Sequence, residues 1–291
     1  MTAPQARAST APRSLAFRLG RFFGTSGTYV LLIVMVLVTV APFAWMIGTA
    51  LKTQQEIFIY PPTLWPAEPQ WGNFAAVLER VPFVRFYLNS VIVTVVITVA
   101  QVVTSALAGY AFARIEFPFK NAVFVLFLAT LIVPNQVTML PLFLLVSRLG
   151  WIDTYQALTV PFLANAFAVF FLRQFFLTVP RELEEAATID GAGRLRVLFT
   201  IVLPLARPAL ATISLFIFLG EWDNYLWPLI VTNSQAMRTL PIGLRFFVEE
   251  SGSQLHLMMA GAVMAVAPIL LLFFMAQKQF IEGVAMTGSK G

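Results

Sequence analysis

The sequence predicts an all-α polytopic membrane protein, and three observations support this prediction. Of its 291 residues, 59% are hydrophobic and 11% are charged, whereas ordinary soluble domains contain roughly 45–50% and about 25%. The apolar residues form long runs, each close to the ~20 residues that cross the ~30 Å hydrocarbon core of a bilayer as a helix. Charged residues or turn formers separate the runs. A soluble domain of this length could not bury so much apolar surface, so that class is excluded.

Six such runs predict six transmembrane helices. The first run is longer than the 7 to 15 apolar residues of a cleaved signal peptide, so we expect it to be an uncleaved anchor. The runs divide the chain into a cytoplasmic N-terminal tail (1–27), a transmembrane domain (28–281) and a cytoplasmic C-terminal tail (282–291). The predicted helices lie near residues 28–50, 88–113, 121–146, 155–178, 204–231 and 260–281.

The distribution of Lys and Arg predicts that both termini are cytoplasmic. With the N-terminus inside, 13 of the 19 basic residues fall on the cytoplasmic side and six on the opposite side, as the positive-inside rule requires. The same distribution accounts for the net charge of +5. We therefore expect no nucleic-acid partner.

The sequence lacks the residues that several kinds of active site require. There is no Cys and only one His, His256, which excludes disulfides, thiolate metal sites and a histidine cluster. No G-x-x-x-x-G-K-[ST] pattern occurs, so the chain has no P-loop for ATP. We expect no catalytic residue, no metal site and no cofactor on this chain, and any energy from ATP must come through another polypeptide.

The predicted cytoplasmic loop at about 179–204 carries the most specific pattern. Residues 180–191 predict a short helix with acidic residues in its first turn, where they complement the helix dipole, and with Gly191 placed to end it. Residues 195–199 then add an apolar stripe on a second short helix. Such a helical pair either docks into a groove of a partner protein or lies on the membrane surface, and periodicity alone leaves both interpretations open.

Polar residues in the third and fifth predicted helices are candidates for a substrate pathway. Glu221 and Asp223 are the only acids expected within the membrane, where a charge costs ~2.5–3.5 kcal/mol on insertion scales and should face protein or water. Two amides follow Pro134, where we expect the third helix to break. Alternatively, the residues of the fifth helix form an outer aromatic belt and the acids reach water at the membrane rim. The candidate pathway residues are Asn135, Gln136, Glu221, Trp222, Asp223, Asn224 and Tyr225.

The long outer loop predicted at about 52–87 is rich in Pro and Trp and ends in an amphipathic stretch. It is either an interfacial segment anchored by aromatic side chains or a contact surface for an external partner. The sequence alone leaves both interpretations open.

The pattern E-A-A-x3-G-x9-I-x-L-P, at residues 185–204, resembles a known family. It is similar to the EAA loop of the permease subunits of binding-protein-dependent ABC importers, and residues 190–192 and Pro208 resemble the carbohydrate-uptake branch. In that family the loop enters a cleft of a cytoplasmic ATPase and couples nucleotide-driven closure to the membrane helices. The resemblance implies that the ATPase-coupling residues are Glu185, Ala186, Ala187, Asp190, Gly191, Leu203 and Pro204.

The resemblance extends over nearly the whole chain from about residue 28 and is to the maltose-type permeases. It implies the type I ABC importer permease architecture and a non-catalytic, multi-pass subunit that moves a carbohydrate-like solute across a bacterial or archaeal plasma membrane by alternating access. The implied partners, besides membrane lipid, are a second homologous permease, two cytoplasmic ATPase subunits that bind ATP and Mg, and an extracytoplasmic solute-binding protein. The alternative is an ion-driven secondary transporter of a small polar solute. Such carriers commonly show internal repeats, and none is evident here.

Overall fold

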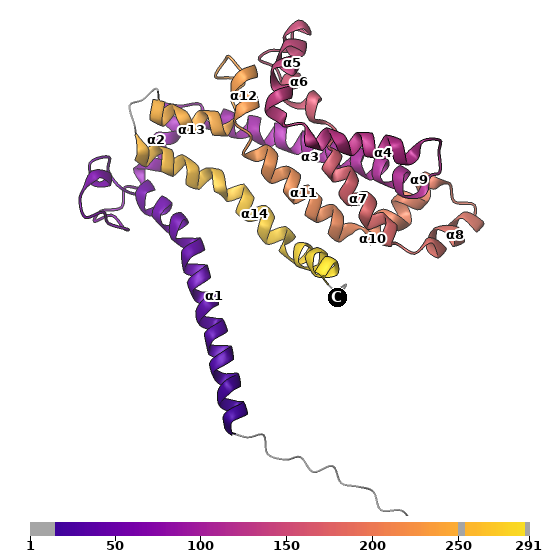
Figure 1. Cartoon of the computed structure of the whole chain (residues 1–291). Helices are drawn as coiled ribbons and strands as arrows, with labels where there is room; N and C mark the ends of the chain where they lie inside the picture. The colour runs from indigo at the N-terminus through magenta and orange to yellow at the C-terminus, as the bar shows by residue number, and fades with distance from the viewer. Residues whose placement is uncertain (1–14, 250–253, 289–291) are drawn as a thin grey trace, which may run out of the picture.

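The computed structural model describes residues 15–249 and 254–288, and this part of the chain is helical with no β-strand. The prediction of an all-α chain is therefore confirmed (Figure 1). Four short helical segments are of another type than α: the 3₁₀ turns η1 (Glu56–Phe58), η2 (Thr130–Ile132) and η3 (Val160–Phe162), and the π-helical η4 (Leu198–Val202). The helices are α1 (Leu15–Ala50), α2 (Gly72–Arg80), α3 (Phe83–Arg114), α4 (Lys120–Ala129), α5 (Asn135–Arg148), α6 (Tyr155–Thr159), α7 (Ala166–Thr178), α8 (Arg181–Ile189), α9 (Arg194–Val197), α10 (Leu203–Leu205), α11 (Arg207–Trp222), α12 (Leu226–Val231), α13 (Leu240–Glu249) and α14 (Leu255–Gly288).

Three unbroken helices are long and apolar enough to cross a membrane, and three further candidates are bent pairs. The unbroken candidates lie at Gly27–Ala50, Phe83–Arg114 and Leu255–Met275. The bent pairs are Lys120–Ile132 with Asn135–Arg148 (96°), Tyr155–Phe162 with Ala166–Thr178 (41°) and Arg194–Leu205 with Arg207–Trp222 (82°). If each bent pair is one span, the described chain has up to six. The number of spans and the side of each terminus remain predictions.

The helix boundaries differ from the expected ones in a consistent way. α1 begins at residue 15 rather than 28, and α14 continues to residue 288, into the predicted C-terminal tail. Ala16, Leu19 and Arg21 before the first run, and Glu282, Ala285 and Met286 after the last, are good helix formers, so the helix continues past the predicted span at each end although both extensions also contain Gly. The remaining tail residues, 1–14 and 289–291, lie outside the described residues.

Three helices form the centre of the bundle. α7 and α11 both pack against α3, and their buried side chains, including Leu172, Phe176 and Ile213, form one apolar cluster. Polar side chains of α3 also bond across the interface: Gln101 donates to the carbonyl of Phe162 at 2.7 Å and Thr104 to that of Leu163 at 2.9 Å. Such interhelical hydrogen bonds are characteristic of helix packing in membranes.

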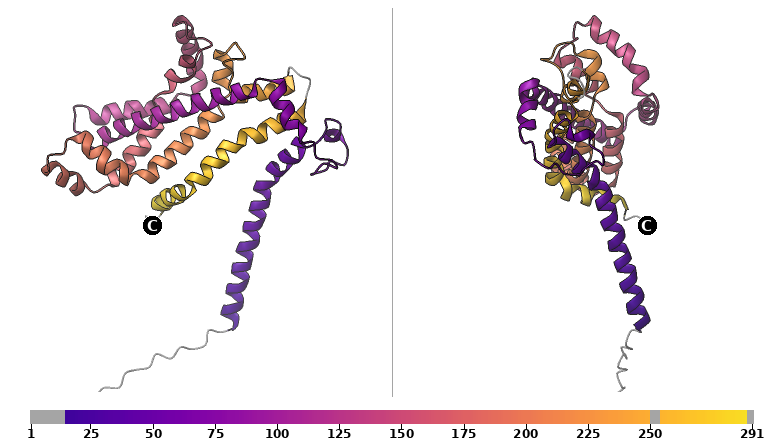
Figure 2. Two further views of the ribbon diagram at one scale, coloured as in Figure 1. Left: turned by 180° about the vertical axis from the view of Figure 1, so that it is seen from behind. Right: turned by 90° about the vertical axis from the view of Figure 1, so that its left-hand side faces the viewer.

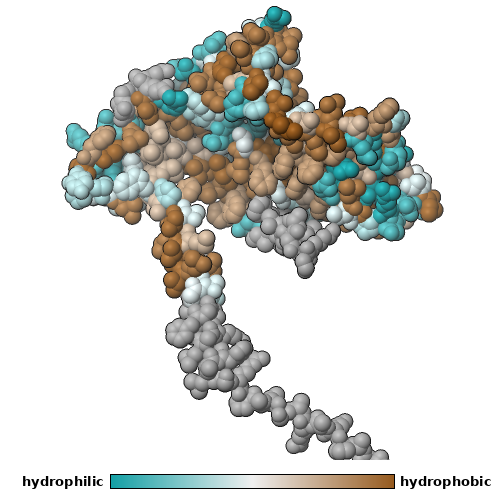
Figure 3. Space-filling view, in the orientation of Figure 1, coloured by the Kyte–Doolittle hydropathy of each residue, from teal (hydrophilic) through white to brown (hydrophobic). Residues whose placement is uncertain are grey.

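α1 leaves the bundle at an angle, and Figures 1 and 2 show it pointing away from the other helices. None of its most apolar 18-residue window is buried within the chain. It packs against α14 near its C-terminal end, where Asn73 of α2 donates to the carbonyls of Ala50 and Lys52 at 2.8 and 2.9 Å. The space-filling view shows the described part of α1 as mostly hydrophobic surface (Figure 3). A segment of this kind requires lipid or another protein to cover it.

The 149–154 turn joins α5 to α6 and packs on the segment after α12. The Asp153 carboxylate accepts the backbone N–H groups of Asn233 at 2.9 Å and Ser234 at 3.0 Å. Burial raises the pKa of the Asp153 carboxyl, but the hydrogen bonds from Ser234 and Asn233 outweigh it, so that the pKa lies below its ordinary value. Asp153 also has a φ of +63°, a conformation that Asp tolerates better than most residues.

Candidate functional site

The loop at 179–204 contains the short helix that the sequence predicts. α8 runs from Arg181 to Ile189 and has acidic residues in its first turn. The chain turns out of the helix at Gly191, two residues after its end, where φ is +82°. The N–H of Gly191 bonds to the carbonyl of Thr188 at 3.0 Å and that of Ala192 to Ala187 at 2.9 Å, so the last turn is closed by a left-handed glycine.

α8 presents most of its surface to solvent. It has no buried residue, and Glu185, Ala186, Asp190 and Gly191 are exposed. Hydrophilic side chains gather at the end of the molecule where α8 and α9 lie (Figure 3). These four residues are therefore accessible to a partner.

The remaining residues of the predicted coupling set lie closer to the bundle. Ala187 and Leu203 are half-buried and pack against the cluster formed by α3, α7 and α11, whereas Pro204 is exposed. Leu198 and Val202 of η4 are fully buried in the same cluster. The base of the loop therefore shares one core with three membrane helices, and a displacement of the loop moves that core because protein interiors are close-packed.

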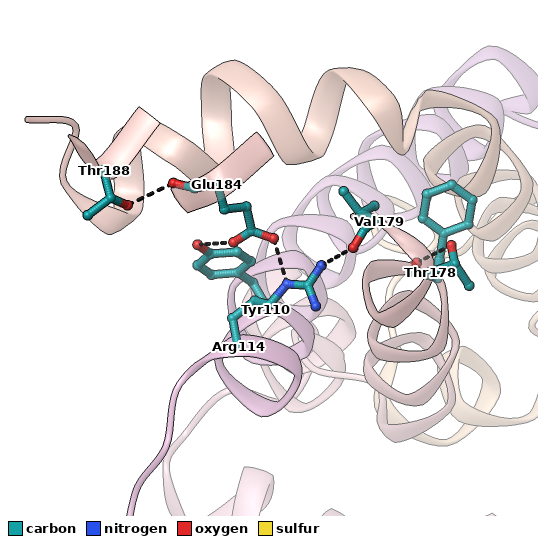
Figure 4. A network of polar contacts seen from close by, with 7 residues as sticks. Tyr110, Arg114, Thr178, Val179, Glu184 and Thr188 are labelled. Carbon is teal, nitrogen blue, oxygen red and sulfur yellow. Dashed lines mark hydrogen bonds and ion pairs between the residues drawn. The ribbon is translucent and has the colours of Figure 1, made fainter. Parts of the chain in front are cut away.

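An ion pair that is largely shielded from solvent joins α8 to α3. The Arg114 Nε donates to Glu184 Oε1 at 2.5 Å, and the Tyr110 hydroxyl donates to Glu184 Oε2 at 3.1 Å. The side chains of Arg114 and Glu184 are only 8% and 12% exposed. Arg114 Nη2 also donates to the carbonyl of Val179 at 2.6 Å. Figure 4 shows Glu184 pointing from α8 toward both α3 residues. We call Tyr110, Arg114 and Glu184 the loop clasp.

The sequence prediction did not include the loop clasp. Glu184 and Glu185 are neighbours on a helix and therefore point about 100° apart, so only one of them can face α3. Arg114 stands at the end of the apolar run of α3, and its partner lies 70 residues further along the chain. The sequence does contain a basic residue at the end of an apolar run and, separately, a short helix rich in acids. These indicate that an ion pair could form, but not which acid forms it.

A cavity of about 510 Å³ lies between the start of α5 and the end of α11. It brings together six of the seven residues predicted for the substrate pathway, although the two groups are more than 80 positions apart in the chain. Thr138, Met139, Phe162 and Gly220 also line it, and the sequence prediction did not include these. The predicted residues that line it are Asn135, Gln136, Glu221, Asp223, Asn224 and Tyr225.

Trp222 is the predicted residue that the structure does not place in this cavity. Its side chain is 4% exposed, and its indole N–H donates to the carbonyl of Ala265 in α14 at 3.2 Å. Its ring stacks on Phe218 and meets the edge of Tyr87, with centroids 5.6 Å away in both cases. Because residue 222 points about 100° away from Glu221 on α11, Trp222 packs α11 against α3 and α14 instead.

The polar groups around the cavity suit a solute with many hydroxyl groups. The Asn224 amide donates to the Glu221 carboxylate at 3.4 Å, and the Tyr225 hydroxyl accepts from Arg245, whose guanidinium also lies 5.2 Å from the Tyr225 ring centre. Carboxylate, amide and aromatic groups together supply hydrogen-bond partners and apolar faces for sugar rings. Among the described residues, no group of three acidic or histidine side chains is placed to hold a metal ion.

Comparison with protein families and sequences gives consistent matches. Residues 101–284 match the family described as "Binding-protein-dependent transport system inner membrane component". The arabinooligosaccharides transport system permease protein AraQ of Halalkalibacterium halodurans is 41% identical over 203 residues, which cover 70% of this chain and 73% of that protein. The sn-glycerol-3-phosphate transport system permease protein UgpE of Agrobacterium fabrum is 34% identical over 268 residues, which cover 89% and 95%.

Comparison with solved structures supports the fold. A bacterial ABC transporter involved in the import of the acidic polysaccharide alginate contains a chain with a TM-score of 0.79 and 24% identity, covering 93% of this chain and 100% of that one. A bacterial alginate ABC transporter in complex with an alginate pentasaccharide-bound periplasmic protein gives a TM-score of 0.62 at 14% identity, covering 88% and 96%. At these identities the likeness is one of fold.

Proposed function

Because the chain belongs to the family of inner-membrane components of binding-protein-dependent transport systems, we propose that it forms half of the path by which an ATP-driven importer moves a carbohydrate-like solute. The observation that carries this proposal is the 179–204 loop. Its exposed helix α8 is joined through the loop clasp and through η4 to the core of the membrane helices. The loop therefore has one surface for a partner and one fixed to the transport domain.

The partner for α8 is a cytoplasmic ATPase subunit, present in two copies, which binds the ATP and Mg. Glu185 and Ala186 offer a negative charge beside a slim surface that a cleft can enclose. Asp190 and Gly191 complete the exposed end of the loop, while Ala187 and Leu203 pack its base against the bundle and Pro204 lies exposed after Leu203. In this arrangement the chain itself is not catalytic, and the loop faces the cytoplasm, as the distribution of basic residues predicts.

A second homologous permease completes the transport path. α1 leaves its apolar surface uncovered by the rest of the described chain, which supports a protein neighbour in the membrane. The cavity beside α5 and α11 is the proposed contribution of this subunit to the path. Its six predicted residues form the solute-facing surface, and an extracytoplasmic binding protein delivers the solute.

The relatives support the class of solute. One is named for arabinooligosaccharides and another for sn-glycerol-3-phosphate, and both are polyhydroxylated. The proposed location is the plasma membrane of a bacterium or archaeon, in which the chain crosses the bilayer six times with both termini in the cytoplasm.

The experiment that tests this proposal is purification of the chain from its native host in mild detergent, followed by reconstitution into vesicles. We expect an ATPase and a second permease to copurify, and we expect uptake that requires ATP and the binding protein. Uptake by the chain alone, or uptake driven by an ion gradient without ATP, would refute the proposal.

A substitution in the cavity tests the solute-facing surface. Gln136→Leu removes one amide from the cavity lining and should raise the solute concentration for half-maximal uptake about tenfold, which corresponds to about 1.4 kcal/mol. The matched control is Gln156→Leu, because Gln156 is an exposed residue of α6 that does not line the cavity. Equal effects of the two substitutions would contradict the assignment.

A further inference from the structure

A second cavity, of about 450 Å³, lies where the end of α3, the start of α4 and the end of α7 meet. It is separate from the substrate-facing cavity and shares no lining residue with it. Three basic side chains line it, from Lys120, Arg173 and Arg181, together with one acidic side chain, Glu116. We call it the basic pocket.

The charges in the basic pocket do not balance. Lys120 is 13% exposed, and its ammonium group bonds to the Glu116 carboxylate at 3.1 Å, but the Glu116 side chain is 82% exposed. The two arginines then leave a formal excess of two positive charges. Within the described part of the chain Arg181 makes no hydrogen bond or ion pair, and it is exposed. An anion in the pocket would restore neutrality.

Arg173 is fixed in an orientation that leaves donors free for such an anion. Its guanidinium lies over the ring of Phe124, 4.3 Å from the ring centre, and its Nε donates to the carbonyl of Phe112 at 3.3 Å. Arginine has five N–H donors, so the two terminal amino groups are not used by these contacts. Their planar arrangement matches the oxygens of a phosphate group.

The basic pocket lies at the boundary of the hydrocarbon core. The apolar run of α3 ends at Arg114, that of α4 begins after Lys120 and that of α7 ends at Thr178. These helix ends lie together at the α8 end of the bundle (Figure 1). Anionic phospholipids place their phosphate groups at this depth, and basic pockets between membrane helices bind such headgroups.

The neighbouring surface suits the acyl chains of a lipid. Phe119, which lines the pocket, is 82% exposed. Val123, Val125 and Leu126 continue along α4 as exposed apolar side chains. Leu177 of α7 is both exposed and part of the pocket lining. A basic pocket that opens beside an apolar helix face has the two parts that a phospholipid requires, whereas a free phosphate ion would use only the first.

We propose that the basic pocket binds the phosphate headgroup of an anionic phospholipid, whose acyl chains lie along the exposed face of α4. Lys120 and Arg173 hold the phosphate from the bundle side, and Arg181 closes over it from the first residue of α8. Because Arg181 begins α8, the helix that also carries Glu184 of the loop clasp, the lipid also holds the N-terminal end of the 179–204 loop in place. The proposal rests on the pocket alone and is independent of the proposed function.

The test is lipid binding by the purified protein, together with the subunits that copurify with it. Phosphatidylglycerol is titrated into the detergent-solubilised protein, and binding is followed by native mass spectrometry and by the unfolding temperature. Phosphatidylcholine with the same acyl chains and inorganic phosphate are the two comparison ligands. We expect phosphatidylglycerol to bind and to raise the unfolding temperature, and we expect neither comparison ligand to do so.

Two variants assign the binding to the basic pocket. Arg181→Gln and Lys120→Gln should each weaken phosphatidylglycerol binding about fivefold, the value of one basic residue near an anionic surface. Arg181 is exposed and, among the residues that the structure describes, makes no hydrogen bond or ion pair that its loss would break, so that variant should fold. The control is Arg148→Gln, because Arg148 ends α5 and lies outside the pocket.

Three outcomes would overturn the proposal. Equal binding of the two lipids would show that the pocket does not recognise the headgroup charge. An equal effect of inorganic phosphate would assign the pocket to a free anion. Unchanged binding in both pocket variants, or an equal loss in the Arg148 control, would place the lipid elsewhere.

Discussion

Replacing Arg114 by Met should detach the 179–204 loop from the membrane helices. Met keeps much of the length of the arginine stem but removes the guanidinium, and with it the 2.5 Å contact to Glu184 and the 2.6 Å bond to the carbonyl of Val179. The Glu184 carboxylate, whose side chain is 12% exposed, then retains only the hydroxyl of Tyr110 as its partner within α3. A buried charge left in this state is unstable unless it moves to water.

The magnitude follows from the burial of the pair. Removing one partner of a buried ion pair costs about 3–5 kcal/mol, and since the two side chains are 8% and 12% exposed we take the lower end, about 3 kcal/mol. Because each 1.4 kcal/mol is a factor of ten, the ratio of docked to undocked α8 should fall by about 100-fold. In the proposed importer, ATP hydrolysis on the partner would then no longer move the bundle.

The assay measures solute uptake and ATP hydrolysis in the same vesicles. We expect Arg114→Met to reduce uptake more than tenfold and to raise the ATP consumed per solute molecule. Glu184→Gln should have a similar effect, and the double variant should be no worse than either single one, because both remove the same contact. Glu116→Gln is the control, since it breaks an ion pair whose acid is 82% exposed and should cost under about 1 kcal/mol.

Two results would refute this reasoning. If the effects of Arg114→Met and Glu184→Gln were additive, the two residues would not act as a pair. If uptake were unchanged while the unfolding temperature fell, the loop clasp would stabilise the fold without contributing to coupling.

Three further predictions concern stability. Gly191→Ala should lower the free energy of unfolding by about 1–2 kcal/mol, because residue 191 has a φ of +82°. Gly193→Ala, at a φ of −70° and with open space around it, should lower it by under about 0.5 kcal/mol, and equal unfolding temperatures of the two variants would contradict this. The pKa of Asp153 is lowered in the folded chain, so the ionised carboxylate stabilises the fold fully above its ordinary pKa of about 3.9, and this stabilisation is lost as the pH falls through the lower folded pKa. The difference in free energy of unfolding between wild type and Asp153→Asn should therefore disappear on acidification. A constant difference from pH 7 to pH 2 would argue against the hydrogen-bond explanation. Gly48→Ala would place a Cβ 2.0 Å from a backbone carbonyl oxygen of the next loop and should lower the unfolding temperature strongly, whereas Gly72→Ala, with nothing within 4 Å, should not; a tolerated Gly48→Ala would show that the loop can move aside.

The fold class could be predicted because it depends on quantities that the sequence states directly. Apolar runs of bilayer length require helices, since a backbone in hydrocarbon must satisfy its own hydrogen bonds. The bends were less accessible. Pro134 indicated the break in the third run, and the structure has a 96° bend there. A hydropathy pattern shows where apolar residues lie but not the angle between two helices, so the angle could not be predicted. The break after Trp222, which separates α11 from α12, was not predicted, although Asp223 and Asn224 interrupt the apolar run there.

In the candidate sites too, features that depend on local sequence could be predicted, whereas those that depend on the packing of distant helices could not. The motif at 185–204 fixed the position of α8 and of its terminal glycine because both depend on local sequence. The choice between Glu184 and Glu185 as the inward-facing acid depends on where α3 lies, and Trp222 was grouped with its neighbours because they adjoin it in sequence. Three-dimensional placement separated them, since adjacent helical residues point about 100° apart.

The angled position of α1 has a consequence for the order of assembly. Most of its length makes no contact with the bundle, so a neighbouring subunit can engage it without first separating helices that are already packed. Association of α1 with that subunit then requires mainly the displacement of lipid from α1, and few contacts between helices of this chain have to break. Helix association after independent insertion is a general route for membrane proteins, and here one helix is left available for it from the beginning. The remaining helices can complete their own packing before, during or after that encounter.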